Sequence, residues 1–342
     1  MLLTADLHLT DAPADEYRWD VFRALTEAAV RLGENHIGIL GDITDRKDRH
    51  SAALVNRLVG ELLALREVIG TYGVIDIIMG NHDEPLRGAP FWSFLHQLPG
   101  IRFHTEPTVV EDGRLLLLPY SPNPVEAWEG LDLTAYKAVF IHQLVTGVVV
   151  DGKELTADKH PLPPLPPKAR IYAGDIHAHQ KVGPVQYIGA PHPVKFGDDY
   201  PCRLLVLDDE TYRITNEIKL DPMRKHMLDV GSMEELNGKL LLDRWPIKQG
   251  DQARIRYTLP LADIGKWARI KDDIAAWARE HEVVLFSLEA VVEAGERAPA
   301  GAAAPNPFTA PGAVYDAFCA HEQLDAELVM VGREILSSVI EA

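Results

Sequence analysis

The stretch HIGILGDITD, residues 36–45, joins a short apolar run to a polar end. An apolar run of this length, bounded by turn residues, is typical of a buried β-strand. Gly41 lets the backbone turn where a side chain would clash, and Asp42 follows at once. Ligand sites in α/β sheets lie beyond the carboxyl ends of the strands. The stretch therefore predicts a central strand whose end carries a functional group.

Further apolar runs end in the same way. They are MLLTAD (1–6), VIDIIMGNHD (74–83), KAVFIHQ (137–143) and ARIYAGDIH (169–177). Segments with helical spacing lie at residues 15–34 and 51–73, between the first strands. Strands that alternate with helices predict an α/β fold with layered sheets. In such a fold, the polar strand ends would converge on one pocket.

The rest of the chain predicts a smaller second part. Residues 253–260, 261–282 and 283–293 have the patterns of a strand, a helix and a strand. We expect a first domain at 1–222, a small α/β domain at 223–292, an Ala- and Pro-rich linker at 293–313 and a C-terminal helical segment at 314–342.

The composition indicates a globular protein of a reducing compartment. Hydrophobic residues make up 46% of the 342 residues and charged residues 25%. No apolar run reaches the roughly 18 residues of a membrane-spanning helix, and the N-terminal stretch lacks the basic and apolar regions of a signal peptide. Two cysteines, Cys202 and Cys319, do not make a disulfide framework. We therefore expect a cytoplasmic protein that does not bind membranes.

The net charge of −17 limits how the protein can bind a polyanion. An acidic protein does not attract nucleic acid by its overall field. A polyanionic substrate would therefore need a local basic surface or bound metal ions.

Each polar strand end has an ordinary explanation when it is taken alone. Asp6 and His8 would point the same way on an extended strand end, but such a pair is common in solvated loops. Asp42 suits a helix N-cap as well as a metal, Asn81 suits a turn, and His142 suits a core histidine. Together they form a set of oxygen and imidazole donors without cysteine. This set predicts a site for two divalent ions, with Asp42 as the bridge.

The motifs D-x-H (6–8), G-D-x-x-D (41–45), G-N-H-D (80–83), a lone His142 and a final histidine cluster resemble those of the calcineurin-like metallophosphoesterases. Within them the chain looks most like the SbcD-type DNA-repair nuclease subunit of bacteria and phages. The stretch YIGAPHPVKFGDDY (187–200) is similar to the one that follows the last motif in such subunits. The resemblance implies a β-sandwich flanked by helices, a small strand–helix–strand cap domain and C-terminal helices. It also places a phage-encoded form in the host cytoplasm.

The resemblance also implies a ligand set. One ion would be held by Asp6, His8, Asp42 and His177, and the other by Asp42, Asn81, His142 and Asp175. The ions would be Mn²⁺ first, with Mg²⁺, Fe²⁺ or Zn²⁺ as alternatives, and would activate a hydroxide for attack on phosphorus. His82 would be the catalytic acid. Asp45 would contact the ligands without binding a metal itself or would be structural, and Asp83 would orient His82 or cap a turn.

The last motif, AGDIHAHQ (173–180), departs from the family pattern G-H-x-H. Aligning Gly174 and Gln180 with the family's Gly and Gln puts Asp175 on the first His and His177 on the second. His179 then falls outside the site. The rival alignment makes His177 and His179 the ligand pair and places Asp175 behind them. An Asp ligand would make the shell harder and favour Mn²⁺ or Mg²⁺.

The resemblance favours the nuclease subunit of an SbcC/SbcD-like complex, an exonuclease or endonuclease. A phosphodiesterase or phosphatase that acts on a small molecule or phosphoprotein is the alternative, and a scaffold without activity is a third reading. The run DRKDRH (45–50) offers phosphate contacts or simply a solvated helix start. Its candidates are Arg46, Lys47, Arg49 and His50. The expected partners are DNA, an SbcC-type coiled-coil ATPase that supplies DNA affinity, and a second copy in a homodimer.

Overall fold

The computed structural model describes residues 1–85, 88–240 and 246–292, with 315, 316, 319, 329, 330 and 333. The expected linker at 293–313 lies outside the described residues, as does most of the expected helical segment at 314–342. Residues 1–259 and 265–291 form one compact unit, which contains all the sites described below. The second unit comprises residues 260–264 and 292–342, most of them outside the described part of the chain.

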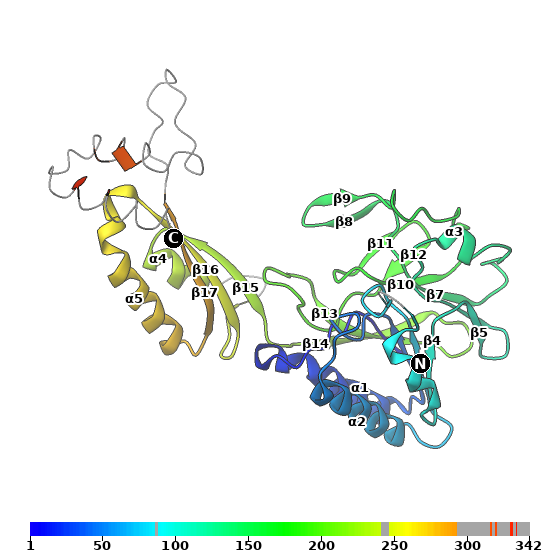
Figure 1. Cartoon of the computed structure of the whole chain (residues 1–342). Helices are drawn as coiled ribbons and strands as arrows, with labels where there is room; N and C mark the ends of the chain where they lie inside the picture. The colour runs from blue at the N-terminus through cyan, green and yellow to red at the C-terminus, as the bar shows by residue number, and fades with distance from the viewer. Residues whose placement is uncertain are drawn as a thin grey trace. The chain divides into compact units, whose positions relative to one another are not determined.

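Two six-stranded sheets form the body of the first unit (Figure 1). One has the order β14-β13-β1-β2-β3-β4 and the other the order β11-β12-β10-β7-β6-β5. The strands of the first sheet are β1 (Leu2–Thr4), β2 (His36–Leu40), β3 (Val74–Ile78), β4 (Ile101–His104), β13 (Cys202–Leu207) and β14 (Ile214–Leu220). Those of the second are β5 (Thr108–Val110), β6 (Leu115–Leu118), β7 (Ala138–His142), β10 (Ile171–Gly174), β11 (Gln180–Val182) and β12 (Val185–Tyr187).

The inner strands of both sheets are parallel, so their carboxyl ends share an edge within each sheet. Strands β1 to β4 run parallel to one another, and so do β6, β7, β10 and β12. One buried cluster contains Leu3 of the first sheet and Phe140 of the second, which shows that the sheets pack face to face. The predicted layered α/β fold is confirmed.

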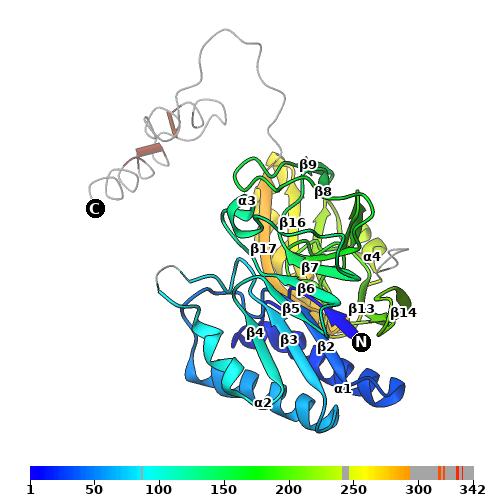
Figure 2. The same cartoon turned by 90° about the vertical axis from the view of Figure 1, so that its right-hand side faces the viewer.

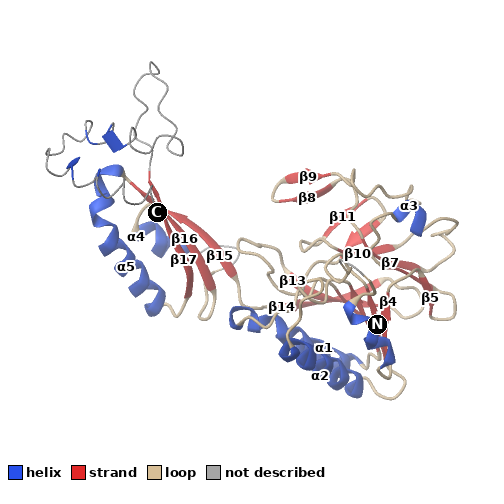
Figure 3. Cartoon of the chain, in the orientation of Figure 1, coloured by secondary structure: helices blue, strands red, loops and turns tan. Residues whose placement is uncertain are grey.

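Helices α1 (Asp20–Leu32) and α2 (Ala52–Val68) cover the other face of the first sheet (Figure 2, Figure 3). The helical elements are η1 (Pro13–Trp19), α1 (Asp20–Leu32), α2 (Ala52–Val68), η2 (Phe91–Gln97), α3 (Pro124–Ala127), α4 (Met233–Lys239), η3 (Leu261–Lys266) and α5 (Trp267–Glu280). Phe22 of α1 and Leu58 of α2 lie in one core cluster with Ile37 and Ile75 of the sheet. Burial of this apolar face stabilises both helices.

Two helix boundaries differ from the sequence prediction. Residues 13–19 form a 3₁₀ helix, so the α-helix begins only at Asp20. The second helix ends at Val68 rather than near Gly73, because Gly70 adopts a left-handed backbone with φ of 81°. Ser51 caps its start, since the Ser51 side chain accepts a hydrogen bond from the Leu54 N–H at 3.1 Å.

The expected strand–helix–strand segment belongs to a three-stranded sheet. Its strands are β15 (Lys225–Val230), β16 (Gln252–Leu259) and β17 (Val284–Val292). Ile274 and Trp277 of α5 pack against Ile255 of β16 in a separate core cluster. The additional helix α4 was not predicted from the sequence. A further two-stranded hairpin, β8 (Val148–Val150) and β9 (Lys153–Leu155), was not predicted either.

A buried ionic cluster joins three strands of the first sheet. The carboxylate of Asp76 accepts hydrogen bonds from His36 at 2.7 Å, His104 at 2.6 Å and Arg102 at 2.7 and 2.5 Å. Burial raises the pKa of Asp76, but the hydrogen bonds from His104, His36 and Arg102 outweigh it and hold this pKa well below its usual range. The folded protein therefore favours the ionised carboxylate.

We expect Asp76→Asn to lower the free energy of unfolding by about 3–5 kcal/mol, because it leaves a guanidinium and two imidazoles without their buried anion. Urea denaturation at neutral pH measures this loss. Because the folded pKa is depressed, the contribution is present above the unfolded pKa of about 3.9 and is lost as the pH falls toward the lower folded value. Wild-type stability should fall in that window more steeply than that of the variant.

Glu16→Gln is the matched control for this prediction. Glu16 forms an exposed bidentate pair with Arg57 at 2.6 and 2.7 Å, and such pairs contribute less than about 1 kcal/mol. If Asp76→Asn costs no more than this control, the buried cluster does not stabilise the fold.

Candidate metal centre

The structure brings the predicted ligands together where the strands of the two sheets end. Asp6 and His8 follow β1, Asp42 follows β2, Asn81 and His82 follow β3, His142 ends β7, and Asp175 and His177 follow β10. Each lies at or just after the carboxyl end of a parallel strand, as expected for a site in an α/β sheet.

Asp42 lies at the middle of the cluster. Its Oδ2 is 3.4 Å from His8 Nε2, and its Oδ1 is 3.3 Å from His142 Nε2. Asp42 belongs to two groups of three residues, and within each group the potential ligand atoms all lie within 4.8 Å of one another. The two groups are His8, Asp42 and His82, and Asp6, Asp42 and His142. A carboxylate shared in this way can bridge two ions about 3.5–4 Å apart.

The hydrogen bonds of His142 define which of its nitrogens faces the site. Nδ1 lies 2.6 Å from the Leu40 carbonyl oxygen, which only accepts, so Nδ1 carries a proton. In the neutral ring Nε2 then presents a lone pair, 3.0 Å from Asn81 Oδ1 and 3.9 Å from Asp175 Oδ1. Nε2 and the oxygens of Asp42 and Asp175 are all acceptors, and the Asn81 amide can turn to donate to Asp42 at 3.1 Å and to Nε2 at 3.0 Å when no cation is bound. Divalent cations fit such a donor set.

The pKa shifts of the residues in this cluster also favour bound cations. Burial lowers the pKa of His142, but the charges of Asp42 and Asp6 outweigh it and hold that pKa well above its usual range. Burial raises the pKa of Asp6 well above its usual value, and Asp6 Oδ2 has no hydrogen-bond partner among the described residues. Burial also opposes ionisation of Asp42, whose pKa is nevertheless held low by His142 and His8. The cluster therefore needs positive charge, which a proton or metal ions supply.

His177 and Asp175 approach this cluster from β10. His177 Nε2 lies 3.1 Å from His8 Nε2, and burial together with the charge of His8 lowers the pKa of His177 to about 3. It is therefore unprotonated near neutrality and offers a lone pair. The backbone N–H of Asp175 donates to Asp6 Oδ1 at 2.9 Å. The structure thus places His177, rather than His179, against His8.

We expect Asp175→Ala to retain one Mn²⁺ ion of two, because it removes an oxygen that faces His142. His179→Ala should retain both ions. Elemental analysis of the dialysed proteins measures the metal content per chain. Loss of an ion from His179→Ala would instead support the alignment that makes His177 and His179 the ligand pair.

The backbone at the ligands is not the extended one that the sequence analysis assumed. Strand β1 ends at Thr4, and Asp6, His8, Asp42 and Asp175 have left-handed φ angles of 54°, 42°, 52° and 78°. For residues other than Gly this costs about 1–3 kcal/mol each. The expectation that an extended strand end orients Asp6 and His8 is therefore wrong, although both side chains reach Asp42.

Gly41 makes the close approach of the two sheets possible at this edge. Its φ is 83°, and a Cβ there would lie 2.2 Å from His142 Nδ1 and 2.8 Å from the Gly80 Cα. Any larger residue would displace His142 from the Leu40 carbonyl.

His82 and the two flanking aspartates have distinct contacts. The His82 backbone N–H donates to Asp42 Oδ1 at 2.8 Å, and its Nδ1 lies 2.7 Å from the Asp45 carbonyl oxygen. Asp45 Oδ1 lies 3.4 Å from His8 Nδ1. Asp83 accepts from the Gly80 and Ile43 N–H groups at 2.9 and 3.1 Å, so it caps the loop. Burial and the Asp42 charge raise the pKa of Asp83 to about 7.

Two buried residues behind the centre were not identified from the sequence. Arg18 donates to the His8 carbonyl oxygen and, at 3.1 Å, to that of Val194. His192 Nε2 lies 2.9 Å from the Leu7 carbonyl oxygen. The only available signal for His192 was its place in the stretch after the last motif, and Arg18 had none.

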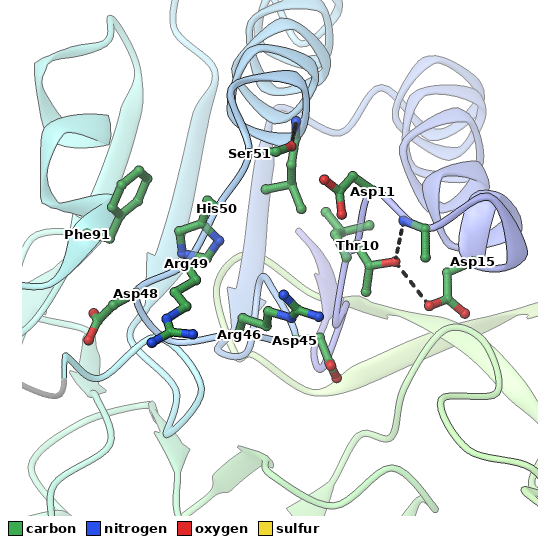
Figure 4. A pocket seen from close by; sticks show the side chains of 13 residues that line it. Thr10, Asp11, Asp15, Asp45, Arg46, Asp48, Arg49, His50, Ser51 and Phe91 are labelled. Carbon is green, nitrogen blue, oxygen red and sulfur yellow. Dashed lines mark hydrogen bonds between the residues drawn. The ribbon is translucent and has the colours of Figure 1, made fainter.

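The basic run after Asp45 borders a cavity of about 600 Å³ (Figure 4). Arg46 and Arg49 are exposed and line this cavity. Lys47 instead pairs with Glu84 at 3.2 Å.

His50 also lines this cavity but packs against the rings of Phe91 and Trp92 at 4.5 and 4.7 Å. Burial lowers the pKa of His50, so its ring is neutral at pH 7. Of the four candidates, Arg46 and Arg49 therefore present positive charge to the cavity.

No family model and no curated protein matches the chain. Among solved structures, the chain is similar to the crystal structure of Pseudomonas putida nuclease MPE. The sequence identity is 16% and the TM-score 0.27, over 64% of this chain and 86% of that chain. Among the described residues, no helix has the length and apolar character needed to cross a membrane.

Proposed function

We propose that the protein is a metal-dependent phosphodiesterase that cleaves DNA, the nuclease subunit of an SbcC/SbcD-like complex. The observation that supports this most is the position of Asp42, whose two oxygens separately face His8 and His142 at 3.4 and 3.3 Å. A single carboxylate between two sets of nitrogen and oxygen donors suits a pair of divalent ions. Such pairs clamp the attacking and leaving oxygens of a phosphoryl centre.

The ligands would divide between the ions as the resemblance implies. Asp6, His8, Asp42 and His177 would hold one ion, and Asp42, Asn81, His142 and Asp175 the other. When bound, the ions, Mn²⁺ by preference, supply Lewis acidity and lower the pKa of water.

His82 would act on the leaving group. Because Nδ1 faces the Asp45 carbonyl at 2.7 Å, it keeps its proton, and Nε2 is the nitrogen that would give a proton to the departing oxygen. The Asp45 carboxylate, 3.4 Å from His8, would hold the His8 ring in its ligating orientation.

Arg46 and Arg49 would contact DNA phosphates beside the centre, since both line the adjoining cavity. Two arginines do not offset a net charge of −17. We therefore propose that an SbcC-type ATPase supplies most of the DNA affinity. A homodimer is a further proposal, and it rests on the resemblance alone.

The acidic character of the chain favours a second candidate function. Asp11, Asp15, Asp45 and Asp48 line the same cavity as the two arginines. A small diester carries a single charge and needs no basic track, so a phosphodiesterase or phosphatase for small molecules or phosphoproteins would tolerate this lining.

Cleavage of an end-labelled DNA duplex with Mn²⁺, beside bis(p-nitrophenyl) phosphate, tests the proposal. We expect hydrolysis of both, lost on chelation and restored by Mn²⁺. Hydrolysis of the small diester alone, even with the ATPase added, would favour the second candidate. No hydrolysis of either substrate with Mn²⁺, Mg²⁺, Fe²⁺ or Zn²⁺ would contradict both.

A further inference from the structure

The hairpin formed by β8 and β9 is a separate two-stranded sheet that does not continue either large sheet (Figure 1). Its turn is Asp151-Gly152, with φ angles of 51° and 73°, and this pair of left-handed residues closes a tight two-residue hairpin. An isolated two-stranded hairpin is only marginally stable in water. Some further contact must therefore hold it in place.

Two contacts hold the hairpin: Val148 of β8 is buried in the core cluster of the second sheet, and Gln180 binds Val149 through its side-chain amide. The amide oxygen accepts from the Val149 N–H at 2.8 Å, and the amide NH₂ donates to the Val149 carbonyl oxygen at 3.0 Å. The side chain thus pairs with the backbone of β8 as a neighbouring strand would. Gln180 begins β11, three residues after His177. The hairpin is therefore tied to the segment that carries the last ligands.

The hairpin forms one wall of a cavity of about 700 Å³. Val149 and Leu155 line it from the hairpin, Asp175 and His177 from the metal centre, and Lys195 from the loop after β12. The volume lies within the range of about 300–1,000 Å³ that small-ligand sites occupy. The cavity thus opens directly onto the candidate ligands.

This cavity and the one beside Arg46 lie on different sides of His8. His8 Nε2 faces His177, which lines the hairpin cavity, at 3.1 Å. His8 Nδ1 faces Asp45, which lines the other cavity, at 3.4 Å. A chain that enters one cavity and leaves by the other would pass the metal centre.

Lys195 is the lysine that lines the hairpin cavity, whose lining also includes Asp151, Asp175, Asp198 and Asp199. Its side chain is exposed, and no carboxylate among the described residues forms an ion pair with it. The nearby Asp198 is engaged with the loop itself, accepting from the Val194 and Lys195 N–H groups at 2.8 and 2.7 Å and from the Tyr200 hydroxyl at 3.1 Å. The ammonium is therefore free to contact a phosphate.

We propose that the hairpin cavity binds a single nucleic acid strand on one side of the phosphodiester that is cut, with Lys195 on a backbone phosphate. Gln180 is then a positioning residue that holds the hairpin against the bound nucleic acid strand. The inference rests on the proposed function, because it assigns a substrate path to the same centre.

Gln180→Ala tests this role against Gln186→Ala as the matched control. Gln186 is a second half-buried glutamine, whose amide donates to the carbonyls of Gln180 and Tyr187 at 3.2 and 3.1 Å and does not contact the hairpin. Gln180→Glu is the second variant, because its carboxylate still accepts from Val149 but cannot donate. Hydrogen exchange over residues 148–155 reports whether the hairpin is released.

We expect faster exchange of the hairpin in Gln180→Ala. The ratio of kcat/KM for a single-stranded oligonucleotide to that for bis(p-nitrophenyl) phosphate should fall about tenfold, through the KM of the oligonucleotide. Gln180→Glu should lie between Gln180→Ala and wild type, and Gln186→Ala should match wild type. In Lys195→Ala, the dependence of log K for the oligonucleotide on log salt should become shallower by about 0.7, as for one lost phosphate contact.

A released hairpin with an unchanged ratio would overturn the inference, as would an equal loss on both substrates. Wild-type protein that hydrolyses the small diester but no oligonucleotide would also overturn it, while leaving the metal chemistry intact. Failure of wild type on both substrates would instead mark the failure of the proposed function itself.

Discussion

Asp42→Asn should reduce hydrolysis of bis(p-nitrophenyl) phosphate by at least about 10³-fold, since metal ions supply several kcal/mol of transition-state stabilisation. The two Asp42 oxygens face different histidines, His8 and His142. Asparagine keeps one oxygen and no charge, so it cannot join two cations. We therefore expect the Mn²⁺ content to fall along with the rate.

Elemental analysis and steady-state rates measure the two effects on the same preparations. Asp132→Asn is the control, because Asp132 is an exposed aspartate whose carboxylate accepts from the Thr134 N–H at 2.9 Å, away from the centre. A variant at Asp42 that kept two ions and most of its rate would rule out the bridging role.

His82→Ala should lower kcat for DNA by about 10²–10⁴-fold, the range for loss of a general acid, while both ions stay bound. The reason is the fixed Nδ1 contact to the Asp45 carbonyl, which leaves Nε2 for the leaving oxygen. The loss should be smaller for bis(p-nitrophenyl) phosphate, because p-nitrophenolate leaves without needing a proton. Rates on both substrates, with metal content, measure the difference.

The position of His82 also allows a different role for this residue, that of a metal ligand. Its ring is close enough to His8 and Asp42 to be a metal ligand itself. If His82→Ala loses an ion, and if both substrates suffer equally, His82 is a ligand and not the acid.

The sequence predicted those features that depend on neighbours along the chain. Apolar runs followed by polar residues located β1, β2, β3, β7 and β10, because strand burial and strand termination are both local patterns. From these came the layered α/β fold and the group of polar strand ends. The motifs also located Asp42 at the centre, and the structure places that residue between His8 and His142.

The helix ends and the hairpin had weaker local signals. Gly70 ended the second helix earlier than Gly73 would have, since either glycine could adopt the left-handed backbone. The Asp151-Gly152 pair is a strong hairpin signal, although no hairpin was predicted there.

Only the tertiary structure decided which side chains meet. His177 lies against His8, 169 residues earlier in the chain, and Gln180 pairs with Val149 across 31 residues. Lys47 pairs with Glu84 and His50 packs on aromatic rings, so a basic run of four candidates presents two charges to its cavity. Local patterns specify which segments become strands, but side-chain contacts depend on how distant strands are packed. The left-handed ligands Asp6, His8, Asp42 and Asp175 show this most clearly, because hydrogen bonds to distant residues, such as His8 N–H to the Asp42 carbonyl oxygen and Asp175 N–H to Asp6 Oδ1, both at 2.9 Å, accompany a costly backbone.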